Sequence, residues 1–196
     1  MSEKFHPPLW GNFVYFADQD LLAFAILFRA GLIAPSMYHL TQSTEKYFKA
    51  LALSIIDPNG VRATAKTESW LKKKSGHNLC DLARKCGEKH SFYMKDSIQT
   101  HLKRFSEFDQ LARYPWVVQK HGNGFTSSDV PIFEEIIYHL RTDIPITKDD
   151  YPLGLLIRGH FYGKPESKFV SFIQNQSIAL DALNSIFRNP ARLIKG

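Results

Sequence analysis

One segment limits the possible folds more than any other, because its largely apolar side chains recur at steps of three and four residues. The repeat consists of Met37, Leu40, Thr44, Tyr47, Phe48, Leu51 and Ile55. With 3.6 residues per turn, this spacing places them on one face of an α-helix, which must be buried against another element. Pro35 suits the first turn of such a helix, and the turn-forming run at 57–60 suits its end. We therefore predict a helix over about residues 36–56.

Helical patterns recur along the rest of the chain, and no convincing run of alternating strand residues appears. A helix is predicted over residues 18–30, where Asp18 and Asp20 near its start suit the positive end of the helix dipole. The short loop that follows implies an antiparallel hairpin with the next helix. Further helices are predicted over residues 78–89, over 95–112, after Pro131 and after Pro165.

Two segments lack a clear helical pattern. Residues 61–76 are polar and rich in lysine, so we interpret them as a mobile connection, and residues 117–128 form a loop at the best candidate boundary. The expected class is all-α: an up-and-down antiparallel helical bundle in residues 1–116. A mainly helical C-terminal extension, residues 117–196, is expected to pack on that bundle.

The positive charge of the chain is concentrated in one stretch. The formal net charge is +6, and eleven basic but only four acidic residues fall between Arg62 and Arg104. Such a region favours an anionic partner, namely a nucleotide, RNA or an acidic protein. The alternative is a solvated lysine-rich face with no partner.

Targeting and cysteine patterns indicate a cytoplasmic protein. The N-terminus lacks the basic, apolar and small-residue sections of a signal peptide. The most apolar run, residues 21–33, is interrupted by Arg29 and is too short to cross a bilayer. Cys80 and Cys86 alone do not make a disulfide scaffold. We expect no membrane association, no metal site and no cofactor.

Three segments in order resemble HEPN domains over about residues 16–116. The run Ala30-Gly-Leu, continued through Gln42, Glu45, Lys46 and Lys49 to Ala50-Leu51, resembles the family pattern A-G-L-x-x-x-A-x-x-x-x-x-Q-x-x-E-K-x-x-K-A-L. Ser36 departs from it, standing at the middle alanine. Later, His77-Asn-Leu79 resembles the family's H-x-L, and Arg113-Tyr-Pro115 its R-Y-P. The resemblance implies a homodimer whose polar residues Gln42, Lys46 and Lys49 face a cleft between protomers.

Active HEPN proteins are metal-independent ribonucleases with an arginine and a histidine separated by four to six residues. Arg84 and His90, with five residues between them, resemble this motif. The histidine would transfer protons and the arginine would stabilise the phosphate. Lys85 departs from the family's polar residue after the arginine, and the pair falls on the third predicted helix, whereas the family motif tends to lie later. These departures favour a non-catalytic binding module.

The candidate ligand-binding residues therefore share positive charge or polarity. They are Gln42, Lys46, Lys49, Lys72, Lys73, Lys74, His77 and Arg113. His77 begins a predicted helix, whose free N–H groups suit an anion. The preferred hypothesis is an HEPN-like module that presents a basic cleft to a nucleotide, RNA or a partner protein. The alternative is a ribonuclease of toxin–antitoxin type, restrained by an antitoxin partner, for example a nucleotidyltransferase.

Overall fold

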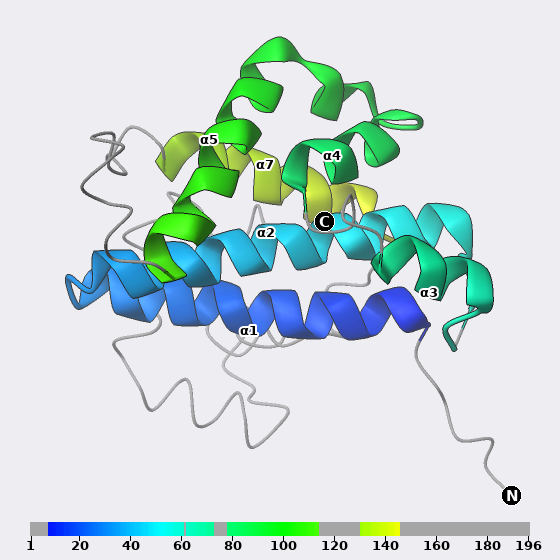
Figure 1. Ribbon diagram of the computed structural model, residues 1–196, viewed down its shortest axis with the longest axis horizontal. Helices are drawn as coiled ribbons and strands as arrows, with labels where there is room; N and C mark the ends of the chain where they lie inside the picture. Colours follow the sequence, from blue (N-terminus) through cyan, green and yellow to red (C-terminus); the bar gives the residue numbers. More distant parts are fainter. Residues whose placement is uncertain (1–7, 61, 73–77, 114–129, 146–196) are drawn as a thin grey trace, which may run out of the picture.

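A pair of long antiparallel helices forms the base of the fold in the computed structural model, which describes residues 8–60, 62–72, 78–113 and 130–145 (Figure 1). Within these ranges the chain is helical and contains no strand. In chain order the elements are α1 (Leu9–Arg29), α2 (Ile33–Ile56), α3 (Ala65–Lys72), α4 (Leu79–Gly87), the 3-10 helix η2 (Ser91–Met94), α5 (Asp96–Arg113) and α7 (Val130–Asp143). The expected all-α bundle is confirmed for this part of the chain.

Gly31 makes the tight turn between α1 and α2. Its φ of +77° lies in the left-handed region that glycine adopts without the strain of a side chain. The N–H groups of Gly31 and Leu32 donate to the carbonyl groups of Phe28 and Leu27, which closes the end of α1. The turn therefore reverses the chain within a few residues, and the two helices run side by side (Figure 1).

Helix α2 lies at the centre of the bundle. It contacts α1 on one side and α4, α5 and α7 on the other (Figure 1). Helices on both sides explain why its burial extends well beyond a single stripe: polar Ser43 and Thr44 are fully buried, and their hydroxyl groups donate to backbone carbonyls. Of the predicted repeat, all members except Ile55 are buried, and Ile55 is half-buried.

The predicted start of the first helix was wrong. The structure begins α1 at Leu9, directly after Pro8, and Trp10, Val14 and Ala17 of the added turns are buried. Asp18 consequently lies in the middle of the helix, as does its neighbour Asp20, so neither stabilises a helix N-terminus.

The segment read as a mobile connection also differs from the prediction, because residues 65–72 form α3. The side chain of Thr64 accepts a hydrogen bond from the N–H of Thr67 at 3.3 Å, which caps the helix start. Thr67 is buried, and Trp70 and Leu71 pack against the core. Two apolar side chains and a cap thus outweigh the polar composition of this segment.

The remaining predicted helices within the described ranges are confirmed. Helices α4, α5 and α7 match the predictions at 78–89, at 95–112 and after Pro131. The loop at 117–128 and the helix after Pro165 lie outside the described residues, as does the proposed boundary between 116 and 117. Helix α7 packs against α2 and so belongs to the same core. None of the helices described is both long enough and apolar enough to span a bilayer.

Candidate functional site

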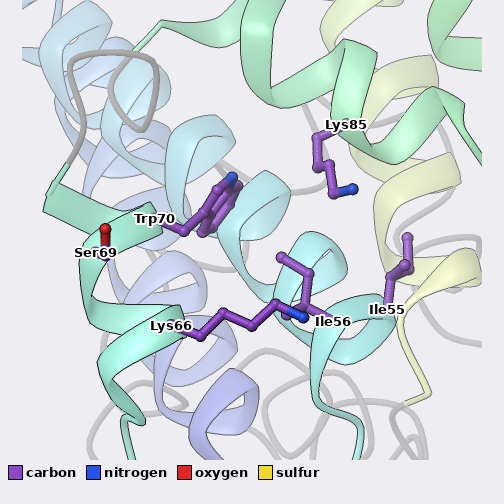
Figure 2. A pocket seen from close by; sticks show the side chains of 6 residues that line it. All are labelled: Ile55, Ile56, Lys66, Ser69, Trp70 and Lys85. Atoms are coloured by element: carbon purple, nitrogen blue, oxygen red, sulfur yellow. The ribbon is translucent and has the colours of Figure 1, made fainter.

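A pocket of about 480 Å³ opens where the C-terminal end of α2, α3 and α4 meet. Figure 2 shows the six side chains that line it. They are Ile55, Ile56, Lys66, Ser69, Trp70 and Lys85. Its volume lies in the range of small-molecule sites in proteins.

Helix α3 supplies half of the lining because Lys66, Ser69 and Trp70 stand at positions i, i+3 and i+4, which share one face of a helix. The core contacts of Trp70 fix the indole, so that it borders the pocket and is still only half-buried. The last turn of α2 adds Ile55 and Ile56 as an apolar surface. The aromatic wall and the apolar surface are therefore held by the same packing that holds α3.

Two ammonium groups reach the pocket from different helices. Lys66 extends from α3 and Lys85 from α4, both toward the space beside the Trp70 ring (Figure 2). Lys85 forms an ion pair with Glu88 at 2.5 Å, whereas exposed Lys66 makes no ion pair with any residue in the described ranges. Among the residues that the structure describes, the acids therefore do not fully neutralise the positive charge of the pocket.

Together these groups suit a planar ligand that carries a negative charge. An indole face can stack on an aromatic ring, two isoleucines exclude water from one side, and two ammonium groups attract an anion. The Ser69 hydroxyl can donate or accept a hydrogen bond. A base with an attached phosphate combines these properties.

Gln42, Lys46 and Lys49, which were predicted to face a cleft between protomers, do not line this pocket. Lys49 is buried and forms an ion pair at 2.6 Å with Glu45, four residues earlier on the same helix. Lys46 pairs with Asp20, which also lies 2.9 Å from Nδ1 of His39. Gln42, on the same face, is half-buried. The charges of both lysines are therefore engaged by acids of the same bundle.

The predicted anion-binding lysines are only partly described. Lys72 ends α3, is exposed and pairs with Glu68 at 3.2 Å. Lys73, Lys74 and His77 lie outside the described residues. Arg113 is the last residue of α5, and its side chain also lies outside them.

The structure gives Arg84 and His90 separate partners. Arg84 is exposed on α4 and pairs with Asp81 one turn earlier. His90 follows the end of α4, and its Nδ1 lies 3.3 Å from Oδ2 of Asp143 at the end of α7. The Tyr93 hydroxyl donates to the same oxygen at 2.8 Å. Burial, and then the Asp143 charge, raise the pKa of Tyr93 well above its usual value, so Tyr93 stays a donor.

Sequence reasoning missed a buried network that joins three helices. Asp18 of α1 accepts hydrogen bonds from the Tyr47 hydroxyl of α2 and from the guanidinium of Arg141 of α7. Arg141 Nη1 also donates to the Tyr47 oxygen at 3.0 Å, and none of the three is appreciably exposed. Burial raises the pKa of Tyr47; it lowers that of Arg141, but Asp18 and Tyr47 outweigh it and leave that pKa raised.

Neither cysteine has the setting of a reactive thiolate. Cys86 is buried and Cys80 half-buried, and both thiols are free. Burial raises the pKa of each, which disfavours the nucleophilic form. In the part of the chain that the structure describes, no three His, Cys, Asp or Glu side chains are grouped as metal ligands would be.

Comparison with known proteins gives no information on the function of the pocket. The chain matches no protein-family model, no curated protein and no solved structure. The resemblance to HEPN domains therefore stays a prediction.

Proposed function

We propose that the protein is a non-catalytic binding module that takes a nucleotide, free or within an RNA strand, into the pocket between α2, α3 and α4. The observation that carries this proposal is the convergence of Lys66 and Lys85 beside the Trp70 ring. The ring supplies a stacking surface for the base, and the two lysines attract the phosphate. A cytoplasmic location, where nucleotides and RNA are abundant, fits this role.

Stacking and charge contribute in different ways. A base stacked on an aromatic side chain contributes about 1–3 kcal/mol and depends little on the identity of the base. The lysines act as point charges, so their contribution weakens as salt screens it. The proposal therefore predicts broad base tolerance and strong salt dependence.

Calorimetric titration with ADP tests binding of a free nucleotide, and fluorescence anisotropy with a labelled single-stranded RNA tests binding within a strand. We expect Trp70→Ala to weaken binding about 5- to 100-fold, from the stacking energy. Lys66→Gln and Lys85→Gln should each also weaken binding. With RNA, each substitution should reduce the slope of log K against log salt concentration by about 0.7 per lost phosphate contact. Neutralising Lys72, Lys73 and Lys74 tests whether these lysines, which follow Trp70 in the sequence, also contact the RNA.

A matched control is Lys103→Gln on α5, which removes the same charge from an exposed lysine that does not line the pocket. It should leave ADP affinity unchanged. Equal losses of ADP affinity in Lys103→Gln and Lys66→Gln would mean that only the net charge of the protein matters. Failure of both ADP and RNA to bind at low salt would refute the proposal.

The resemblance to HEPN domains adds a homodimer to the proposal. Light scattering at micromolar concentrations should then give twice the 22.5 kDa chain mass. A monomer mass at every concentration would remove the shared cleft but not the pocket, because all six lining residues come from one chain.

The second candidate, a metal-independent ribonuclease with an antitoxin partner, is favoured by the contact between His90 and Asp143. A carboxylate at Nδ1 orients the ring and leaves Nε2 for proton transfer. If this site cleaves RNA, His90→Ala should lose about a hundredfold in rate, and Arg84→Lys should also fail. Chelator-resistant cleavage that His90→Ala abolishes, with folding intact, would replace the binding module by this enzyme.

A further inference from the structure

The ion pair of Lys85 distinguishes the two lysines of the pocket. Its ammonium lies 2.5 Å from the carboxylate of Glu88, three residues later, whereas Lys66 has no such acid in the described ranges. Glu88 itself does not line the pocket. An anion that enters the pocket must therefore share Lys85 with Glu88 or replace it.

Two features make this pair easy to exchange. Glu88 caps the C-terminal end of α4, where the partial negative charge of the helix disfavours a carboxylate. The Glu88 side chain is also 58% exposed, and exposed ion pairs contribute little to stability. Release of Glu88 into water therefore costs little, and its carboxylate stays within reach of Lys85.

We propose that Glu88 is an internal competitor of the ligand, which occupies Lys85 in the empty pocket and is displaced by the phosphate of the bound nucleotide. This inference rests on the proposed function and adds a regulatory contact to the same site. A phosphate outcompetes a carboxylate because it carries more charge and more acceptor oxygens. A ligand with only a weak anionic group gains little from the exchange, so the pocket favours phosphorylated ligands.

A double-mutant cycle with ADP isolates this competition. Glu88→Gln should tighten ADP binding about two- to fivefold, which is the range expected for loss of an exposed ion pair. In a Lys85→Gln background the same substitution should change affinity by less than about 1.5-fold, because the competition acts only through Lys85. Thermal unfolding of each variant checks that the fold is retained.

The matched control is Glu68→Gln. It also removes one carboxylate from an exposed lysine–glutamate pair, but its partner Lys72 does not line the pocket. We expect no more than a small gain in ADP affinity from it.

An equal gain from Glu68→Gln, or an equal gain from Glu88→Gln in both backgrounds, would mean that only the general electric field has changed. Either result overturns the competition and leaves the proposed binding function standing, as does ADP binding that Glu88→Gln does not tighten. If no variant binds ADP, the competition is overturned, and if the RNA also fails to bind, so is the proposed function.

Discussion

Two groups of charged residues in this protein differ in their burial and in how far their charges are paired. Asp18 and Arg141 lie in the interior and form a direct ion pair, and the Tyr47 hydroxyl makes a hydrogen bond with each of them. Lys66 and Lys85 line the pocket. Lys66 makes no ion pair with any described residue, and Lys85 pairs with Glu88, whose side chain is exposed and exchangeable. An unpaired charge in the interior lowers the stability of the fold strongly because it loses its hydration. A charge at the surface stays hydrated, so it needs no partner within the protein.

The two groups also involve different sets of helices. The interior network links α1, α2 and α7 by hydrogen bonds. The pocket is lined by residues of α2, α3 and α4, and its two lysines are the ones that we propose to bind the ligand. Mutations should separate them, because the first group should affect the free energy of unfolding and the second should affect affinity.

The largest effect is expected from breaking the interior pair. Arg141→Met leaves the Asp18 charge buried without its cation and should lower the free energy of unfolding by about 3–5 kcal/mol. Asp18→Asn should cost a similar amount. Urea unfolding followed by circular dichroism measures both.

The double variant Asp18→Leu/Arg141→Met sharpens this test. Replacing both charges by apolar side chains removes the uncompensated ion, so it should recover much of the loss. A single variant as stable as the wild type would show that the interior charges are not what holds α7 to α1.

Alkaline pH should act on the same interior region. An unfolded tyrosine ionises near pH 10, whereas burial raises the pKa of Tyr47 and of Tyr93 in the folded chain. Above pH 10 the unfolded state therefore holds fewer protons, and the free energy of unfolding should fall by about 1.4 kcal/mol per pH unit for each tyrosine. Below pH 10 both contributions are fully present. Unfolding curves from pH 8 to 11 should be less pH-dependent in Tyr93→Phe, and identical slopes would contradict the prediction.

A smaller effect is expected at the contact between η2 and α7. Tyr93→Phe removes the hydrogen bond to Asp143 and should cost about 1–2 kcal/mol at neutral pH. The exposed-residue control Tyr15→Phe should leave stability unchanged, because Tyr15 lies on the outer surface of α1. A loss at Tyr93 no larger than that at Tyr15 would show that this hydrogen bond does not hold η2.

The smallest effect on stability is expected at the pocket. Lys66→Gln and Lys85→Gln should each change the free energy of unfolding by less than about 0.5 kcal/mol, as exposed substitutions usually do. Their loss of ADP affinity should occur without a shift of the unfolding midpoint. Destabilisation above 1 kcal/mol would remove the contrast between the two groups of charges.

The sequence predicts the fold well where a repeat is long and uninterrupted. The repeat of α2 is enough to predict that helix, and the helix predicted over residues 78–89 is found as α4, with Leu79, Leu82, Ala83 and Cys86 buried. Helix α3 is missed because only eight residues form it and lysines surround it, so its stabilising contacts by Trp70 and Leu71 come from tertiary packing. The start of α1 is missed because Gly11 and the prolines before it suggest a linker.

The candidate site is harder to predict, since it depends on which helices meet. Lys66 and Lys85 are nineteen positions apart, and only the packing of α3 and α4 against α2 brings them to one pocket. The basic stretch between Arg62 and Arg104 contains both lysines but does not single them out, and Trp70 is a large aromatic residue in a polar segment. Asp18 was read as a local helix signal, because nothing in the sequence relates it to Arg141.

The separation of 123 positions between Asp18 and Arg141 also has a consequence for how the chain acquires its fold. During synthesis α1 and α2 are complete long before α7 leaves the ribosome. Until then the hydrogen bond from the guanidinium of Arg141 to Asp18 cannot form. Contacts between distant positions form slowly because a long loop must close first. We therefore expect the hydrogen bonds that Arg141 of α7 donates to Asp18 and Tyr47 to be among the last contacts that α1 and α2 acquire.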